Sequence, residues 1–155
     1  MGLENMINKI SVKVKKLHPD AIIPYYAHDG DAGLDIFSNE DCIIKAGERK
    51  LISTGISMEL PDGYVALVWD KSGLAGNNGL HCLAGVGDAG YRGEYKIVVF
   101  NTSKDDYYVK KGQKVSQILI QPIMAAEIEE VKELSETKRG DGGFGSTGLI
   151  KNSQV

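Results

Sequence analysis

Short apolar runs separated by turn residues are the feature that most constrains the fold of this chain. Ile10, Val12 and Val14 alternate with polar residues, which is the period of a half-buried strand and not of a helix. Further runs that predict strands lie at residues 42–44, 51–60, 64–69, 95–100, 107–109 and 115–120. Many short strands at this spacing are typical of a sandwich or barrel, so we expect an all-β fold.

Turn and helix signals fill the intervals between these runs. The sequence Pro-Asp-Gly at 61–63 predicts a hairpin turn, and residues 80–100 read as two strands joined by the Gly-Asp-Ala-Gly turn at 87–90. Residues 72–77 predict a short helix. Residues 127–134 suit either a helix or a strand with a bulge.

Length and composition predict a single domain, with a core over about residues 8–135 and an arm over about residues 136–155. A formal charge of −3 predicts no nucleic acid polymer as partner, and the chain has no apolar run of the ~18 residues that a membrane span needs. Its two cysteines lack metal-pair spacing, and no secretory segment opens the chain. We therefore expect free thiols and a cytoplasmic protein, or a nuclear or virion protein in a eukaryote or virus, that is not secreted.

The arm contains a glycine-rich segment, RGDGGFGSTG, at residues 139–148. Glycine allows successive N–H groups to converge on an anion, and Arg139, Ser146 and Thr147 add donors. Phe144 has no apolar neighbours in the segment, so a nucleobase is a suitable flat partner. Taken alone, the composition favours a disordered tail instead.

Five such polar or glycine-bearing segments follow one another along the chain. They are DAGLDIFS at 31–38, DKSGLA at 70–75, GVGDAGYRGE at 85–94, GQKVSQ at 112–117 and RGDGGFGSTG at 139–148. In this order and spacing they resemble the five motifs of the homotrimeric dUTPase family, over about residues 11–148. The resemblance implies a jelly-roll-like β-fold and magnesium-dependent hydrolysis of dUTP to dUMP and pyrophosphate. This hydrolysis would limit uracil in DNA and supply dUMP for thymidylate synthesis. The resemblance also implies a homotrimer with three sites at subunit interfaces.

The second segment places Lys71, Ser72 and Gly73 at the start of the predicted short helix. Outward-pointing amides, a hydroxyl and an ammonium group make an anion site, although an ordinary capped helix with a surface lysine has the same residues. The resemblance implies that these residues bind the triphosphate. Lys71 stands where the family usually has arginine and Asp70 where it often has proline, which predicts weaker phosphate contact.

The third segment is the one that the resemblance assigns to uracil and deoxyribose. Backbone groups around Cys82, Gly85 and Val86 and near Lys96 would pair with the edge of uracil and leave cytosine unpaired. Tyr91 would pack flat on the deoxyribose. Without the motif around it, Tyr91 would read as a common cross-strand aromatic residue.

Asp88 is the candidate catalytic residue. A carboxylate on a tight glycine-rich turn can hold one water in a fixed line, although an isolated aspartate there more often caps its own backbone. By resemblance, Asp88 orients the water that attacks the α-phosphorus. Gly87 replaces the family's usual bulky aliphatic residue, which predicts a looser hairpin and a misplaced water.

The remaining motif residues are assigned by resemblance. Asp35 would support the phosphate-binding segment and the waters of Mg2+, which is held by triphosphate oxygens and water without a direct protein ligand. Gln117 would lie near the phosphates. Lys114 and Ser116 stand where arginine and alanine are usual, and Lys114 reads as a structural change.

By the same resemblance, the arm closes the site. Arg139 would grip the γ-phosphate, Phe144 would stack over uracil, and Gly145, Ser146 and Thr147 would wrap the phosphates. Two alternatives stay open at this point. One is a catalytically impaired dUTP-binding or regulatory module on the same fold, and the other is an enzyme similar to the dCTP deaminases.

Overall fold

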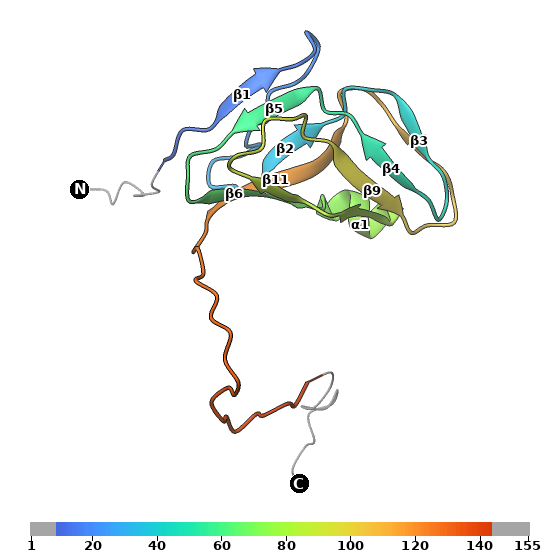
Figure 1. Cartoon of the computed structure of the whole chain (residues 1–155). Coiled ribbons are helices and arrows are strands. Elements are labelled where there is room, and N and C mark those ends of the chain that lie inside the picture. Colours follow the sequence, from blue (N-terminus) through green and yellow to red (C-terminus); the bar gives the residue numbers. More distant parts are fainter. Residues whose placement is uncertain (1–8, 144–155) are drawn as a thin grey trace, which may run out of the picture. The chain divides into compact units, whose positions relative to one another are not determined.

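Short apolar runs form antiparallel strands along much of the chain, and a computed structural model describes residues 9–143 of it (Figure 1). Among these residues, a first unit ends at Ala125 and contains every strand and helix, and a second begins at Ala126. The strands are β1 (Lys13–Lys16), β2 (Leu34–Phe37), β3 (Cys42–Ile44), β4 (Arg49–Ile52), β5 (Ile56–Glu59), β6 (Tyr64–Trp69), β7 (Leu80–Leu83), β8 (Val86–Asp88), β9 (Ile97–Asn101), β10 (Tyr107–Val109) and β11 (Lys114–Pro122). The helix is α1 (Ser72–Asn78).

The strands pair into two larger and two smaller sheets. The larger sheets have the orders β2-β11-β6-β8 and β4-β9-β7, and the smaller ones are the pairs β1-β5 and β10-β3. The expected all-β class with one short helix is confirmed. Within the described part of the chain, no helix has the length and apolar character needed to cross a bilayer.

Most predicted elements form where the short apolar runs indicated them. Strands β3, β6 and β10 have the predicted bounds, and the short helix extends one residue further than predicted. The run 51–60 divides into β4 and β5, with Gly55 at a φ of +68° between them. Residues 127–134 form neither a helix nor a strand. Both cysteines, Cys42 and Cys82, are free thiols.

The predicted hairpin at 61–63 is wrong. Residues 62–63 do form a turn, but β5 before it pairs with β1, whereas β6 after it pairs with β11 and β8. The turn therefore passes the chain from one sheet to another. A local turn signal fixes the change of direction and not the partner of the strand that follows.

The second predicted hairpin is correct in its strands and wrong in its turn. Strands β7 and β9 pair directly, with Cys82 opposite Val99. Residues 87–90 are not a tight turn between them, because the chain forms β8 on the way from β7 to β9. Ala84 and Gly85 have φ angles of 61° and 125° and turn the chain out of β7. The following residues form β8, which pairs with β6 and is an edge strand of the four-stranded sheet. This excursion positions the third motif.

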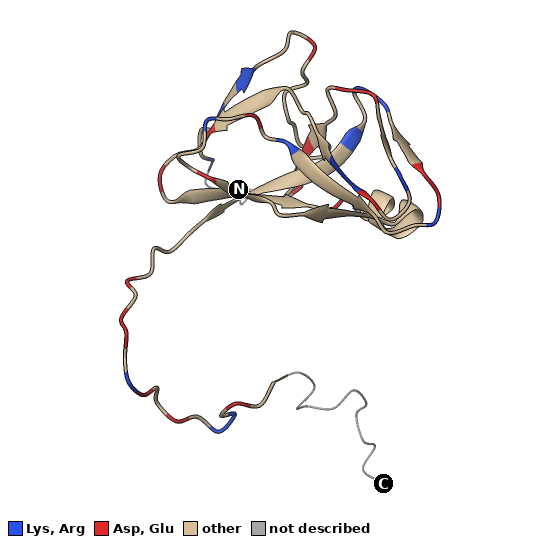
Figure 2. Cartoon of the chain, turned by 45° about the vertical axis from the view of Figure 1, so that its right-hand side comes forward, with Lys and Arg blue, Asp and Glu red and all other residues tan. Residues whose placement is uncertain are grey.

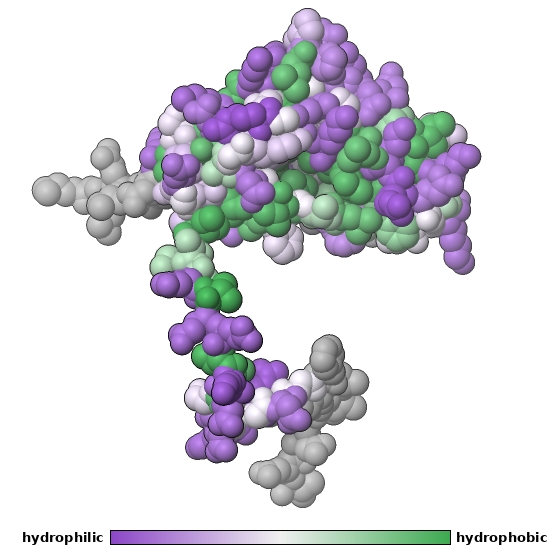
Figure 3. Space-filling view, in the orientation of Figure 1, coloured by the Kyte–Doolittle hydropathy of each residue, from purple (hydrophilic) through white to green (hydrophobic). Residues whose placement is uncertain are grey.

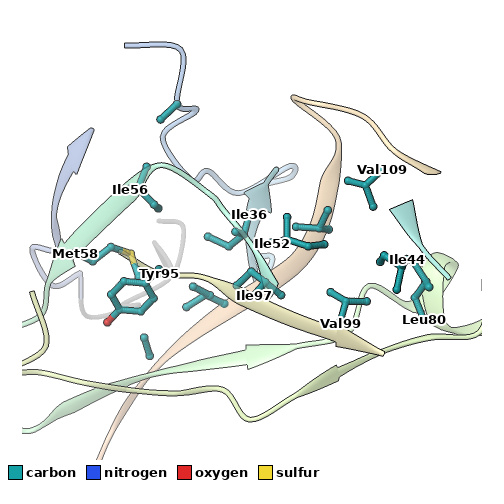
Figure 4. Close-up of a cluster of buried hydrophobic side chains, with 14 of the residues drawn as sticks. Ile36, Ile44, Ile52, Ile56, Met58, Leu80, Tyr95, Ile97, Val99 and Val109 are labelled. Carbon is teal, nitrogen blue, oxygen red and sulfur yellow. The ribbon is translucent and has the colours of Figure 1, made fainter. Parts of the chain in front are cut away.

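One apolar cluster joins the two larger sheets (Figure 4). Ile36 and Ile118 come from the four-stranded sheet, and Ile52, Ile97 and Val99 come from the three-stranded sheet; all five are almost completely buried. Burial of such side chains contributes on the order of 2 kcal/mol each to the stability of the fold. The cluster thus fixes the sheet that carries β6, β8 and β11.

Asn101 is a fully buried polar residue at the end of β9. Its Nδ2 donates to the carbonyl oxygens of Ile44 at 2.9 Å and Asp105 at 2.8 Å. Its Oδ1 accepts from the backbone N–H of Ser103 at 3.0 Å and from the Ser103 hydroxyl at 2.7 Å. One side chain therefore satisfies four polar groups and ties β9 to β3.

Asn101→Leu is expected to lower the free energy of unfolding by about 3 kcal/mol or more, because buried donors and acceptors lose their partners. Denaturant unfolding at one protein concentration measures the change. Thr102→Ala is the matched control, since the exposed Thr102 hydroxyl makes a single bond to the Gly79 carbonyl, and it should cost about 1 kcal/mol or less. Equal losses for the two variants would contradict the role assigned to Asn101.

Candidate active site

A buried carboxylate with two ammonium groups lies beside the start of α1. Asp35, on β2, is 2% exposed; Lys71 Nζ donates to its Oδ1, and Lys114 Nζ lies 2.6 Å from its Oδ2. Burial alone would raise the pKa of Asp35, but the hydrogen bonds from Lys114 and Lys71 outweigh burial and lower it. Asp35 is therefore an ionised counter-ion that holds the residue before Ser72 in place.

Gln117 supports the same segment from β11. Its Nε2 donates to the backbone oxygen of Asp70 at 2.7 Å. A Cβ on Gly33 would stand only 2.2 Å from Gln117 Oε1, so the first motif needs glycine at this position to admit the amide. Gln117 thus fixes the backbone that enters α1, and the structure brings Asp35, Lys71 and Gln117 together as the sequence predicts.

The carboxylate of Asp70 is directed at β7. Its Oδ1 accepts from the backbone N–H of Cys82 at 2.6 Å, and its Oδ2 lies 2.7 Å from His81 Nδ1. Burial would raise the pKa of Asp70, but the hydrogen bonds from His81 and from the Cys82 backbone outweigh burial and lower it. The Cys82 N–H is already used and is not a donor for a base, which corrects the prediction at that residue. His81 was not a predicted site residue, since nothing in the sequence links it to Asp70.

A cavity of about 480 Å3 gathers half of the residues of the third motif. Its walls are formed by Leu51, Val68, Ala84, Gly85, Val86, Gly87, Tyr91, Glu94, Tyr95 and Lys96. Gly85, Val86, Tyr91 and Lys96 were predicted to meet uracil and sugar, and all four line this one cavity. Gly85 must be glycine here, because its φ is +125° and a Cβ would stand 3.0 Å from the side chain of Val68.

Tyr91 is held as one wall of this cavity. Its ring packs edge-to-face on Tyr95, with 5.6 Å between the ring centroids, and its hydroxyl donates to the Glu94 carbonyl at 2.9 Å. A Cβ on Gly93 would come within 2.4 Å of the Tyr91 hydroxyl oxygen, so Gly93 leaves room for the ring. The ring is fixed, and 45% of the residue is exposed for contact with a ligand.

Asp88 ends the edge strand β8 with an exposed side chain. Its backbone carbonyl accepts the N–H of Tyr91 at 3.0 Å, which forms the turn. Among residues 9–143 its carboxylate accepts no hydrogen bond, so Asp88 does not cap its own turn. It is thus the carboxylate next to the cavity that keeps its acceptor positions open.

Tyr95 fills the space beside Gly87. Gly87 is buried, and a Cβ on it would stand 2.7 Å from Tyr95 Cε1 and 2.8 Å from the Tyr95 hydroxyl oxygen. The Tyr95 residue is only 5% exposed. The aromatic ring therefore occupies the volume that a larger residue at 87 would take, and the predicted loosening at Gly87 stays a prediction. Nothing in the sequence indicates this pairing, since the two residues are eight positions apart.

The Asp35 cluster and the Asp88 cavity are separate in one chain. Asp35, Gln117 and Trp69 lie opposite one another across β2, β11 and β6, whereas Asp88 lies opposite Val65. Four residues along β6 and three strand spacings across the sheet place Asp88 about 20 Å from Asp35. The two groups of predicted site residues therefore lie at separate places in one chain.

The residues predicted in the arm belong to the second unit. Arg139 is exposed, and its Nε donates to the Gly142 carbonyl at 2.8 Å within a local turn. Phe144, Gly145, Ser146 and Thr147 lie outside the described residues, so their predicted contacts stay predictions.

Gly87→Val is expected to lower the melting temperature by several degrees, because the new side chain collides with the Tyr95 ring. Tyr95→Leu in the same chain should restore most of the loss, since it vacates the space. Gly90→Ala is the matched control and should be neutral, because a Cβ there meets nothing within 4 Å. Equal losses for Gly87→Val with and without Tyr95→Leu would contradict the steric pairing.

Comparisons with known proteins identify the family of this chain. The dUTPase family model matches residues 19–148. A deoxyuridine 5'-triphosphate nucleotidohydrolase of Clostridium acetobutylicum is 51% identical over 144 residues, which are 92% of this chain and 99% of that protein.

Solved structures match over the same extent. A mutant dUTPase of Staphylococcus bacteriophage 80alpha with dUpNHpp has a TM-score of 0.85 and 30% identity, over 91% of this chain and 100% of that chain. A mutant dUTPase from phage phi11 of S. aureus, described for its coordination of a structural Mg(II) ion, has a TM-score of 0.76 and 28% identity, over 82% of this chain and 100% of that chain. The family match, the identity over almost the full length and the shared fold together show that this chain belongs to the dUTPase family, the deoxyuridine 5'-triphosphate nucleotidohydrolases.

Proposed function

We propose that this member of the dUTPase family hydrolyses dUTP to dUMP and pyrophosphate with Asp88 as the residue that orients the attacking water. The observation that carries the proposal is the cavity beside β8, which joins Gly85, Val86, Tyr91 and Lys96 next to a carboxylate with open acceptor positions. The reaction removes dUTP before uracil enters DNA and supplies dUMP for thymidylate synthesis.

Selection of uracil follows from the position of β8 at the edge of its sheet. An edge strand has backbone N–H and C=O groups that no neighbouring strand uses, and a base can pair with them. The Gly85 carbonyl already accepts the N–H of Val68 at 2.8 Å, so it is the groups around Val86 that would match the acceptor, donor and acceptor of the uracil edge. Cytosine presents the reverse order at two positions and would leave buried groups unpaired. Tyr91 then packs on the deoxyribose, in the space that a 2'-hydroxyl would need.

The chemical step needs a water in line with the α-phosphorus. The Asp88 carboxylate accepts a proton of that water and holds its oxygen toward the phosphorus, while pyrophosphate leaves on the opposite side. Tyr95 supports this geometry by filling the space beside Gly87 and by holding the Tyr91 ring. Because Tyr91 and Gly87 are held in place, the water would stay in line with the α-phosphorus.

On the phosphate side, Lys71, Ser72 and Gly73 supply an ammonium group, a hydroxyl and backbone amides. Lys71 and Lys114 balance the charge of the Asp35 carboxylate, and the Asp70 carboxylate is held on β7 by its hydrogen bond from the Cys82 N–H. Mg2+ would enter with the nucleotide on phosphate oxygens and water, and it neutralises charge on the leaving pyrophosphate. Asp35 would order the waters of the ion from a distance.

A complete site requires more than one chain, and we propose a homotrimer with sites at its subunit interfaces. Asp88 of one copy and Lys71 of another would meet one nucleotide, since they lie far apart in a single chain. Val86 and Trp69 are 70% and 56% exposed, and both line a second cavity on this sheet. Figure 3 shows hydrophobic side chains at the surface of the strand-containing unit. The arm of a third copy, with Arg139 and Phe144, would close the site.

Basic and acidic residues are interspersed over the strand-containing unit in the view of Figure 2. A substrate with several negative charges therefore has to be met by particular donors, not by a broad basic face. This fits a small nucleotide better than a polymer.

The purified protein should release pyrophosphate from dUTP much faster than from dTTP, dCTP or UTP. Asp88→Asn should lower kcat by roughly 10²–10⁴-fold with a small change in KM, because the amide no longer accepts the proton of the water. Asp62→Asn, in the exposed turn after β5, is the control and should keep the wild-type rate. Equal rates on the four nucleotides, or an unchanged kcat in Asp88→Asn, would refute the proposal. Tight dUTP binding without turnover would favour a regulatory module instead, and ammonia release from dCTP would favour a deaminase.

The composite site predicts complementation between inactive chains. Asp88→Asn and Lys71→Met chains, refolded together in equal amounts, should regain about a quarter of wild-type activity, because each site draws its two halves from different copies. At a dUTP concentration well below the KM of Lys71→Met, either variant refolded alone should show little turnover. If both residues served a nucleotide from the same chain, the mixture would gain nothing.

A further inference from the structure

The ammonium group of Lys71, which the proposed function assigns to the triphosphate, is bound to Asp35 in this structure. Asp35 is almost completely buried. A buried carboxylate that loses its cation is strongly destabilising. Lys71 can therefore turn to a phosphate only if another cation keeps Asp35 neutralised.

Lys114 meets this requirement. It comes from β11, next to β2, and its Nζ lies 2.6 Å from Oδ2 of Asp35, the oxygen that Lys71 does not use. The same Nζ lies 5.7 Å from the ring centroid of Tyr25, which stacks on Phe37. Lys114 is thus held beside Asp35 by contacts independent of Lys71.

The backbone next to Lys71 is fixed separately. Gln117 Nε2 holds the Asp70 carbonyl, and the Asp70 side chain is bound to β7. The side chain of Lys71 is 29% exposed. Its transfer from Asp35 to a phosphate then requires rotation of this side chain only, and the backbone between β6 and α1 need not move.

We propose that Lys114 is a positioning residue for substrate binding: it keeps Asp35 neutralised and thereby lets Lys71 exchange Asp35 for the triphosphate. The inference rests on the proposed function, because it takes the triphosphate as the new partner of Lys71. Two cations share one anion before binding, and each has its own anion afterwards. Lys114 therefore acts through Asp35 and Lys71 and needs no contact with the nucleotide.

The test is the effect of Lys114→Met on KM for dUTP in two backgrounds. In the wild-type chain the substitution should raise KM roughly 10- to 100-fold and change kcat less than about threefold, because Lys71 stays on Asp35. In an Asp35→Asn chain the same substitution should change KM less than about threefold, because no carboxylate retains Lys71. Lys114→Arg should keep KM near the wild-type value.

The competing explanation is that Lys114 only adds positive charge near the phosphates. It predicts the same increase of KM in both backgrounds, and that result would overturn the inference. Lys111→Met removes one positive charge from a lysine that pairs with the exposed Asp20 at 2.9 Å, and it should leave KM unchanged. Melting temperatures of all variants show whether each chain is folded.

If Asp35→Asn does not fold, a second cycle decides. Lys71→Met should raise KM in the wild-type chain but add less than about threefold in a Lys114→Met chain, where Lys71 is already retained. Full additivity would overturn the inference. Absence of dUTP turnover in the wild-type protein would instead count against the proposed function, so the two failures are distinguishable.

Discussion

The pairing of β6 with a neighbour on each side is the constraint on which the site depends. On one side, Gln117 of β11 lies opposite both Trp69 of β6 and Asp35 of β2. On the other side, Asp88 of β8 lies opposite Val65 of β6. A slip of one residue in either register would turn every side chain of that strand to the other face. Ala66 on β6 and Ile118 on β11 both belong to the buried apolar cluster, so core packing holds the register of these two strands.

Three aspartates lie close to the proposed nucleotide, and their hydrogen bonds distinguish their roles. Asp35 is bound by two lysines, and Asp70 is bound by His81 and a backbone N–H. These bonds lower both pKa values and use the acceptor oxygens. Among the described residues only Asp88, of the three, keeps both oxygens free for a water. The hydrogen bonds therefore distinguish the open carboxylate of Asp88 from the bound carboxylates of Asp35 and Asp70, which residue type alone does not indicate.

Sequence reasoning succeeded where a property is local. Short apolar runs predicted β3, β6 and β10, and turn residues marked the ends of strands, because both depend on neighbouring residues. Sequence reasoning failed where the partner is distant along the chain: residues 61–63 join strands of different sheets, and residues 87–88 end an edge strand. The same limit applies to the site. The motifs identified its residues, but the contacts of Gly87 with Tyr95 and of Asp70 with Cys82 are set by the fold.

Four departures from the family pattern, at residues 70, 71, 87 and 114, are matched by a second residue. Gly87 removes volume and Tyr95 fills it; Asp70 adds a carboxylate, and β7 supplies its donors. Lys71 and Lys114 both stand where arginine is usual, and the two share Asp35. An ammonium group contacts one carboxylate oxygen, whereas a guanidinium group can contact both. Two lysines can therefore bind the same carboxylate, one at each oxygen. Because these residues work in pairs, a single reversion toward the family pattern, such as a larger side chain at 87, meets a partner already fitted to the present residue. Substitutions at this site should therefore be strongly non-additive, with losses in single variants that the second change of each pair recovers.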